Sequence, residues 1–395
     1  MRPILVVVAS AGALILSLSM GVRQTFGLLL EPMTLARDWS RSEFAIAIAV
    51  QNLLWGLFTP VAGALADRFG TLRVLLAGGC IYVLGILLMA VSASPFAFML
   101  SAGLLVGLGV SATGFPLVLA VVGRMVDERH RSLALGVVAA GGSFGQFILP
   151  PVVQATMQAF DWPGALVALA TASALIVPLA FILIRPGTGV PGTMGGQSLR
   201  QAVAEASGHS GYRLLTAGFF VCGFHVAFVA THLPAYLTAC GMSPMAGAWA
   251  LAGIGLFNIL GTLTAGALGG RLSKKYLLSA IYGLRALVIV IFLALPVTEI
   301  TVTAFAAAFG LLWLSTVPLT SGIVAQVFGP RYVATLFGIV MMSHQVGAFF
   351  GAWLGGYIYD ATGGYTGSWL VAVGLGFFAM LIHLPIREAP LRQPA

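Results

Sequence analysis

Charged residues are scarce in this chain of 395 residues. Aspartate, glutamate, lysine and arginine together make up 8% of its positions, whereas 59% of the residues are hydrophobic and the mean hydropathy is +1.02. A soluble globular domain carries roughly 25% charged residues. The composition therefore excludes an ordinary soluble domain and predicts a protein that lies in a membrane.

Groups that bind metals or attack substrates are also scarce. The three cysteines, Cys80, Cys222 and Cys240, lie in or at the ends of apolar runs without paired spacing, which excludes a disulfide or metal framework. The only lysines, Lys274 and Lys275, lie in a loop, so no lysine within the membrane could form a retinal-type Schiff base. The chain also lacks a pairing of nucleophile and base, and a phosphate-binding loop. We expect no enzyme activity, no cofactor and no direct use of ATP.

Long apolar runs take the place of charge in this sequence. A run of about 18 or more apolar residues can cross a bilayer as a helix, and lipid offers no other partner for backbone donors and acceptors. We therefore predict an all-α membrane protein with twelve transmembrane helices, approximately at 3–30, 43–65, 74–92, 96–123, 133–158, 164–184, 213–239, 244–269, 277–297, 299–326, 334–358 and 369–386.

Most of the 19 lysine and arginine residues fall in loops on one side of the predicted membrane. The exceptions are Arg37 and Arg41, on the other side, and Arg23 and Arg285, within predicted helices. By the positive-inside rule both termini lie in the cytoplasm. The same asymmetry accounts for the net charge of +8, so we expect a lipid bilayer, and no nucleic acid, as the partner of the basic loops.

The only polar stretch of any length is residues 185–212, which are rich in glycine, proline and serine. We interpret this stretch as a cytoplasmic linker between an N-terminal half, residues 1–184, and a C-terminal half, residues 213–395. Each half then holds six of the predicted helices.

The two halves resemble each other in sequence. Gly136-Val137-Val138 with Gly145 recurs, 202 residues later, as Gly338-Ile339-Val340 with Gly347. Such repeats are typical of transporters whose substrate site lies between the halves. We predict two six-helix halves related by a pseudo-two-fold axis, with a cavity at their interface.

One loop combines glycines and charges in an otherwise apolar region. It lies between the second and third predicted helices and reads Gly63-Ala64-Leu65-Ala66-Asp67-Arg68-Phe69-Gly70-Thr71-Leu72-Arg73. A weaker copy, Gly266-Ala267-Leu268-Gly269-Gly270-Arg271, follows the eighth predicted helix and has Gly270 in place of the acidic residue.

This loop resembles the signature of the major facilitator superfamily. The resemblance covers the whole chain and implies a secondary transporter that works by alternating access; we expect a monomer. It also implies that the loop is part of a gate, in which Asp67 docks on the start of the eleventh helix near Ala334 and Thr335, where the helix dipole favours a carboxylate. The gate residues are then Gly63, Asp67, Arg68, Gly70, Arg73, Arg124, Gly266 and Arg271.

Two further stretches are similar to the branch of monocarboxylate transporters and oxalate:formate antiporters. Gly21-Val22-Arg23-Gln24-Thr25-Phe26-Gly27 resembles the first helix of that branch, and Arg131-Ser132-Leu133-Ala134-Leu135-Gly136 resembles its turn between helices four and five. The eighth predicted helix differs, because it lacks the arginine that the branch commonly carries there. The resemblance implies a small substrate of the monocarboxylate kind.

No carboxylate falls in the middle of a predicted helix, whereas Arg23 and Arg285 do lie inside helices. A charge at bilayer depth costs on the order of 3 kcal/mol, so it needs a partner, a wet cavity or a function. An arginine could replace part of the hydration of an anion, so the pattern favours an anionic substrate over a cationic one. The alternative is that both arginine side chains extend to the lipid headgroups.

Polar side chains inside the predicted helices complete the candidate site. His225 and His232 share one face of the seventh helix, and His344 lies in the middle of the eleventh. A buried histidine can bind substrate, carry a proton or be a hydrogen-bonded core residue, and small polar residues also join helices. The candidate substrate-binding residues are Arg23, Asn52, Gln146, His225, Asn258, Arg285, His344 and Gln345.

The function predicted from these patterns is transport of a small organic anion across the plasma membrane, or inner membrane of the cell. Transport would be coupled either to protons or to exchange for another anion. The alternative is an efflux pump for neutral or amphiphilic small molecules, in which aromatic residues line the cavity and Arg23 only extends to the headgroups.

Asp67→Asn tests the gate interpretation, because it keeps the size of the side chain and removes its charge. We expect a lower maximal transport rate with a nearly unchanged affinity, since a gate controls the conformational step and not substrate binding. The measurement is the initial rate of carboxylate uptake into proteoliposomes over a range of concentrations. A large loss of affinity at an unchanged maximal rate would contradict the interpretation.

Overall fold

The computed structural model describes residues 3–125, 128–183, 199–329 and 333–391. Every regular element within these ranges is a helix. In chain order the elements are α1 (Pro3–Gln24), α2 (Phe26–Arg37), α3 (Arg41–Phe69), α4 (Thr71–Val91), α5 (Pro95–Phe98), the π-helix η1 (Met99–Leu105), α6 (Val106–Thr113), α7 (Phe115–Met125), α8 (Glu128–Ala174), α9 (Ile176–Leu183), α10 (Leu199–Gly208), α11 (Ser210–Ala239), α12 (Pro244–Gly269), α13 (Lys274–Ala294), α14 (Glu299–Leu312), α15 (Thr316–Phe328), α16 (Val333–Thr362) and α17 (Thr366–His383).

The described part of the chain contains 11 helical segments that are long and apolar enough to cross a membrane. One of them, Ala134–Leu183, has 50 residues, which correspond to about 75 Å of helix against a hydrocarbon core of about 30 Å. It is interrupted at Asp161, whose φ of 58° and ψ of 178° are not helical. This segment therefore accounts for two crossings, the predicted fifth and sixth, and the prediction of an all-α membrane protein with twelve helices is confirmed.

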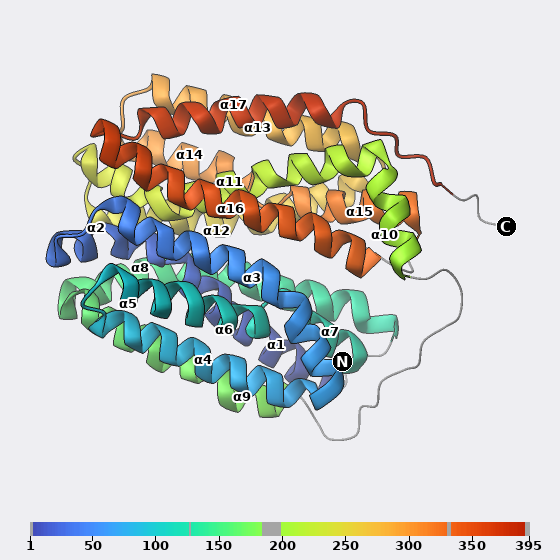
Figure 1. The fold of residues 1–395 in the computed structure, drawn as a ribbon, viewed down its shortest axis with the longest axis horizontal. Helices are drawn as coiled ribbons and strands as arrows, with labels where there is room; N and C mark the ends of the chain where they lie inside the picture. The colour runs from blue at the N-terminus through green and yellow to red at the C-terminus, as the bar shows by residue number, and fades with distance from the viewer. Residues whose placement is uncertain (1–2, 126–127, 184–198, 330–332, 392–395) are drawn as a thin grey trace.

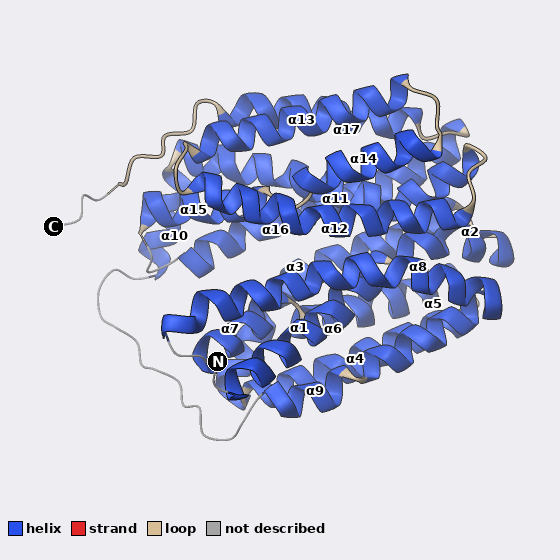
Figure 2. Cartoon of the chain, turned by 180° about the vertical axis from the view of Figure 1, so that it is seen from behind, coloured by secondary structure: helices blue, strands red, loops and turns tan. Residues whose placement is uncertain are grey.

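The helices form two bundles that lie side by side. Figure 1 shows α1 to α9 on one side and α11 to α17 on the other, with α3 and α16 facing each other between them. Figure 2 shows the same division from behind, with α8 and α12 at the boundary. We call the end of the bundle that carries both chain termini the termini end, and the opposite end, where α2 finishes, the far end.

The predicted linker, 185–212, differs in part from what its composition suggested. Residues 199–208 form the helix α10, and α11 begins at Ser210, three residues before the predicted start of the seventh span. His209 precedes α11 and its Nδ1 accepts a hydrogen bond from the backbone N–H of Tyr212. This local cap starts the helix early, a signal that the glycine and serine content of the stretch obscured.

Four of the described crossings are broken within their length. The first is interrupted at Thr25, between α1 and α2; the fourth at Gly114, between α6 and α7; the sixth at Leu175, between α8 and α9; and the tenth between α14 and α15. Pro116 and Pro318 follow the breaks in the fourth and tenth crossings at equivalent positions of the two repeats. Proline has no N–H to donate and disrupts a continuing helix, which explains why the breaks recur at the same place in both halves.

The two halves pack closely through α3 and α16 toward the far end. A Cβ atom added to Gly56 would lie 2.7 Å from the side chain of Gln345, and one added to Gly356 would lie 2.7 Å from the carbonyl oxygen of Arg41. Toward the termini end the same helices carry Gly63 and Gly338, where an added Cβ would meet no atom within 4 Å. The close contact between the halves is therefore concentrated on the far-end side of α3 and α16.

Gly223→Ala tests the close packing of α11 on α16, because an added Cβ would lie 1.7 Å from the carbonyl oxygen of His344. Overpacking of this kind costs about 1–3 kcal/mol, so we expect a lower Tm in detergent. Gly374, in α17, is a matched control with no atom within 4 Å of an added Cβ. Gly374→Ala should leave Tm unchanged or raise it, because alanine favours a helix by about 1 kcal/mol over glycine. A Tm for Gly223→Ala at or above that of the unsubstituted protein would contradict the close packing.

Candidate functional site

Arg23 lies near the end of α1, just before the break at Thr25. Its Nη1 donates a hydrogen bond to Oδ1 of Asn52 at 2.8 Å, and its guanidinium carbon lies 4.6 Å from the ring centre of Trp55. Asn52 is itself fixed, because its Nδ2 donates to the carbonyl of Ile48 at 2.8 Å. Among the described residues no carboxylate forms a salt bridge with Arg23, whose side chain is only half-buried.

These contacts hold Arg23 in one orientation within the protein. The predicted alternative, in which its side chain extends to the headgroups, needs a free guanidinium, whereas this one is bonded to Asn52 and stacked on Trp55. A guanidinium carries five N–H donors in a planar fork that matches a carboxylate. Asn52 takes one of them, so donors remain for an anion on the exposed side of the group.

His344 and Gln345 lie on α16, in the second half. Nδ1 of His344 is 3.1 Å from Oε1 of Gln345, and the His344 ring centre is 5.1 Å from that of Phe219. The side chain of Gln345 lies against Gly56, the neighbour of Trp55 on α3. Of the predicted substrate-binding residues, Arg23 and Asn52 are thus bonded to each other in the first half, and Gln345, which is bonded to His344, meets α3 from the second half.

Gln146 and Asn258 lie at a second boundary between the halves, where α8 meets α12. A Cβ added to Gly255 of α12 would lie 2.8 Å from the backbone of Gln146, whose buried Oε1 has no hydrogen-bond partner. Nδ2 of Asn258 donates to Oγ of Ser143 at 3.0 Å. The structure therefore places these two predicted residues in the interface between the halves, at α8 and α12. Next to Gln146, α8 also packs against the helix that carries Arg23, because a Cβ added to Gly21 of α1 would lie 2.6 Å from the backbone of Gly145.

His225 and Arg285 are fully buried inside the second half. Nε2 of His225 is 2.7 Å from the carbonyl oxygen of Ala372 on α17, and Arg285 donates to the carbonyls of Leu312 and Trp313. Because Arg285 has no exposed surface, the alternative that its side chain extends to the headgroups is wrong. Direct contact of either residue with substrate stays a prediction.

Only Gly70 of the predicted loop 63–73 lies outside a helix, because α3 continues to Phe69 and α4 begins at Thr71. The side chains of Asp67, Arg68 and Arg73 are exposed at the termini end. Asp67 lines a small hollow together with Pro116 and Leu117 of α7. Gly70 has a φ of 93°, which favours glycine and ends α3. Arg68, Arg73, Gly266 and Arg271 are also exposed or half-buried at this end. Thr335, the predicted docking point, is exposed, while the side chains of Arg124 and Ala334 lie outside the described residues; the predicted gate stays a prediction.

At the far end a carboxylate of the second half caps a helix of the first. Oδ1 of Asp360 accepts a hydrogen bond from the backbone N–H of Arg41 at 3.1 Å, and Oδ2 accepts one from the backbone N–H of Ser42 at 2.8 Å. Oγ of Ser40 accepts the N–H of Glu43, so the first three free N–H groups of α3 are all satisfied. From the sequence, we placed Asp360 only among the acids near helix ends. The sequence did offer a signal for the contact, because Asp360 lies in the last turn of α16 as Asp67 lies in the last turn of α3, and the two helices run antiparallel.

Arg41 extends the same contact. Its Nη1 donates to the hydroxyl of Tyr365 at 2.6 Å, its guanidinium carbon lies 3.8 Å from the ring centre of Tyr359, and its Nη2 is 3.9 Å from Glu31. Burial raises the pKa of Tyr365 to about 12, so the hydroxyl keeps its proton near neutral pH and accepts from Arg41 as a neutral group. Arg41 therefore joins α2 and α3 to the turn between α16 and α17.

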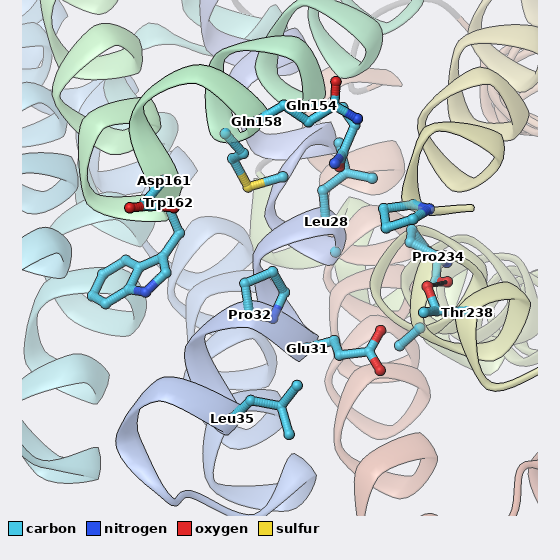
Figure 3. A pocket seen from close by; sticks show the side chains of 14 residues that line it. Leu28, Glu31, Pro32, Leu35, Gln154, Gln158, Asp161, Trp162, Pro234 and Thr238 are labelled. Atoms are coloured by element: carbon cyan, nitrogen blue, oxygen red, sulfur yellow. Dashed lines mark hydrogen bonds between the residues drawn. The ribbon is translucent and has the colours of Figure 1, made fainter. Parts of the chain in front are cut away.

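The far end also holds a hollow of 390 Å³ between the halves. Figure 3 shows Gln154 and Trp162 of α8 on one side of it, Glu31 of α2 on another, and Thr238 of α11 on the side of the second half. Arg37 stacks on Trp162 from outside the lining, at 5.4 Å. The lining residues include two carboxylates, Glu31 and Asp161, and no cation. This hollow therefore does not suit an anion.

Asp360→Asn tests the far-end contact, because the amide would point N–H groups at the backbone N–H groups that the carboxylate now accepts. We expect the halves to separate more often at the far end. Spin labels at Leu35 and Thr362, both exposed on opposite halves, should then gain a population at longer distance. Asp38→Asn, an exposed acid at the same end, is the control and should leave the distances unchanged. Identical distances in both variants would rule out a closing role for Asp360.

Comparison with known proteins agrees with this architecture. The family model of the Major Facilitator Superfamily matches residues 12–316 and 215–395. The chain is 29% identical to Monocarboxylate transporter 13 of Bos taurus, over 96% of this chain and 89% of that protein. It is 28% identical to Monocarboxylate transporter 11 of Homo sapiens, over 97% and 83%, and 24% identical to the uncharacterized MFS-type transporter YcxA of Bacillus subtilis (strain 168), over 87% and 85%.

Among solved structures, the chain is similar to a bacterial homolog of the human lysosomal transporter Spinster in an inward-facing, unoccupied conformation. The TM-score is 0.77 and the sequence identity 15%, and the match covers 100% of both chains. At this identity the likeness concerns the fold. The family model extends over most of the chain and the fold has the expected helices, so this integral membrane protein belongs to the major facilitator superfamily of transporters.

Proposed function

We propose that this protein is a secondary transporter for a small organic anion of the monocarboxylate kind and that it works by alternating access. Both termini would lie in the cytoplasm of a cell whose plasma, or inner, membrane holds the protein, so the far end faces outward. The names of its relatives Monocarboxylate transporter 11 and 13 support the substrate class. Support from the chain itself comes from Arg23.

The single observation that carries the proposal is a fixed guanidinium without a carboxylate partner among the described residues. Asn52 and Trp55 hold Arg23, and its side chain is partly exposed. A cation at this depth gains most from an anion that binds through the remaining donors, and charge-assisted hydrogen bonds of this kind are roughly twice as strong as neutral ones. A substrate carboxylate would supply the missing charge.

His344 and Gln345 extend the proposed site into the second half. Gln345 lies against Gly56 of α3 across the interface and His344 is bonded to Gln345, so a substrate held by Arg23 could also contact α16. Such a substrate would touch both halves, as alternating access requires. Coupling would then follow one of two routes: His344 takes up a proton together with the anion, or a second anion replaces the first.

The two ends of the α3 and α16 pair would act as gates. The far end is held by Asp360 on the start of α3. At the termini end, Asp67 on the start of α16 would make the equivalent contact when the far end opens, with Gly63, Arg68, Gly70, Arg73 and Arg124 shaping that loop. Gly266 and Arg271, in the copy without an acid, would then contribute less.

One observation favours a second candidate function. The far-end hollow is lined mainly by apolar side chains and by two carboxylates, which suits a neutral or amphiphilic molecule better than an anion. An efflux pump for such compounds would use this hollow on the way out. In that case Arg23 would serve only to join α1 to α3.

Arg23→Gln separates the two candidates. We expect the KM for labelled lactate to rise at least about tenfold in proteoliposomes, because the charge-assisted hydrogen bonds to the carboxylate are lost. Arg23→Lys should recover part of the loss, since it restores the charge without the fork. Arg200→Gln, an exposed arginine in α10, is the matched control and should transport like the unsubstituted protein.

The same assay decides the mode of coupling. Uptake that is stimulated by an inward proton gradient indicates symport, and uptake that needs a carboxylate inside the vesicles indicates exchange. Lactate, pyruvate and oxalate should be compared, so that the result does not rest on one substrate. Carboxylate flux that is absent, or that is unchanged in Arg23→Gln, would overturn the anion proposal.

A further inference from the structure

The break between α14 and α15, residues Trp313 to Ser315, has several hydrogen-bond partners although no helix runs through it. We call this break together with Leu312, the last residue of α14, the α14–α15 joint. The carbonyl of Leu311 accepts a hydrogen bond from Oγ of Ser315 at 2.6 Å. The carbonyl of Leu312 accepts hydrogen bonds from Nε and Nη2 of Arg285 at 3.0 and 2.5 Å. The carbonyl of Trp313 accepts a hydrogen bond from Nη2 of Arg285 at 2.5 Å. The N–H of Leu314 donates to Oδ1 of Asn258 at 3.1 Å. Side chains thus replace the helical bonds that the break removes.

Arg285 donates its hydrogen bonds to this joint, and its guanidinium carbon lies 5.3 Å from the ring centre of Tyr282. It lies about 16 Å into α13 by the rise per residue, has no exposed surface and forms no salt bridge with a carboxylate among the described residues. Every hydrogen bond that it makes ends on Leu312 or Trp313. These carbonyls are the last of α14, where the helix dipole is negative, so the joint itself supplies the partial charge that a buried guanidinium needs.

The first half contains a related arrangement, in which a tyrosine stands at the position of Arg285 and bonds to the first crossing. Ser19 and Thr113 bond at 2.9 Å, and 203 residues later Cys222 and Thr316 bond at 3.2 Å. Tyr82 precedes Arg285 by the same interval, and its hydroxyl donates to the carbonyl of Ser19 at 2.9 Å. A tyrosine is therefore enough to join the third crossing to its neighbours in this fold. The arginine is a special feature of the second half.

Asn258 links the joint to the other half of the molecule. Its Oδ1 accepts from the joint at Leu314, while its Nδ2 donates to Oγ of Ser143 on α8 at 3.0 Å. Ser143 belongs to the first half and Asn258 to the second. A movement of α8 relative to α12 would therefore change the bonding of the joint.

We propose that Arg285 and Asn258 are positioning residues: Arg285 holds the α14–α15 joint in its bent form, and Asn258 couples the joint to α8, so that the tenth crossing changes shape when the halves move. This inference rests on the proposed function only for its effect on transport, because the shape of the joint can be measured without any substrate. It replaces the expectation that Arg285 and Asn258 bind substrate directly.

A direct substrate role for Arg285 makes a different prediction. Its Nη1 has no hydrogen-bond partner, so an anion could in principle occupy that one donor. Removal of the guanidinium would then raise KM and leave the backbone of the joint unchanged. A positioning role requires the reverse, a change in the backbone of the joint and in the maximal rate.

Hydrogen exchange of the purified full-length protein in detergent, without substrate, tests the joint itself. In Arg285→Gln we expect the amides of residues 310–318 to exchange at least about tenfold faster, because the loss of hydrogen bonds to a charged group favours local opening. Tyr82→Phe is the matched control from the first half and should leave these amides unchanged while affecting those near Ser19. Exchange at 310–318 that equals that of the unsubstituted protein overturns the proposal.

Initial uptake of labelled lactate then separates positioning from binding. Arg285→Gln and Asn258→Ala should each lower the maximal rate at least about fivefold with KM changed less than twofold, whereas a substrate ligand raises KM. Arg285→Lys, which can still donate to both carbonyls, should recover part of the rate and of the exchange protection. A rise in KM with normal exchange overturns the proposal even if transport of the anion is confirmed.

Two further measurements keep the proposal testable if Arg285→Gln does not fold or lactate is not transported. Arg285→Lys and Ser143→Ala each remove fewer hydrogen bonds than Arg285→Gln, and each should still speed hydrogen exchange at 310–318. Ser143→Ala would act only through Asn258, which bonds both Ser143 and Leu314. If the unsubstituted protein moves no carboxylate, the proposed function fails while the exchange result stands. If Arg285→Lys and Ser143→Ala both leave hydrogen exchange at 310–318 unchanged, the proposed role of the joint is overturned even when no carboxylate is transported.

Discussion

The interior of the bilayer contains no water with which polar groups of the protein could form hydrogen bonds, and this constraint shapes the molecule more than any other. Each broken crossing and each charge within a crossing must find its partner inside the protein. Arg285 meets the carbonyls at the end of α14, and Asp360 meets the N–H groups at the start of α3. Arg23 has only an amide and an indole ring. Of these groups, Arg23 is the one whose charge the described residues leave unmatched.

The same bonds divide the molecule into fixed and movable parts. Within each half, helices approach so closely that glycines meet backbone atoms, as at Gly223 and at Gly145, where an added Cβ would lie 2.0 Å from the Ser17 carbonyl. Between the halves glycines also meet backbone atoms, as Gly27 of α2 does at the Ala230 carbonyl. The polar contacts between the halves include a carboxylate on a helix start, an arginine on two tyrosine rings, and Asn258 on Ser143. Such contacts can break as units, which suits two rigid halves that move about a central site.

The sequence was enough for the fold and for part of the site. Length and hydropathy of the runs predict every crossing, because bilayer thickness leaves little freedom, and the lack of carboxylates within crossings draws attention to Arg23 and Arg285. Distant pairings could not be predicted. Arg285 and Arg23 look alike in sequence, yet one bonds a helix end 27 residues away and the other remains half-exposed. The cap on α3 joins residues 318 apart, so composition and spacing do not predict this contact, and the only signal for it is the matching position of Asp360 in α16 and Asp67 in α3.

The central claim is that the site between the halves favours anions. It is tested most directly by the thermal stability of the purified protein in the presence of small ligands that differ only in charge, since a ligand that binds the folded state raises Tm. Lactate and pyruvate should raise the Tm of the unsubstituted protein and lose that effect in Arg23→Gln, while isopropanolamine, a cation of similar size, should have no effect in either. Stabilisation by the amine, or by neutral amphiphiles but not by carboxylates, would contradict the account.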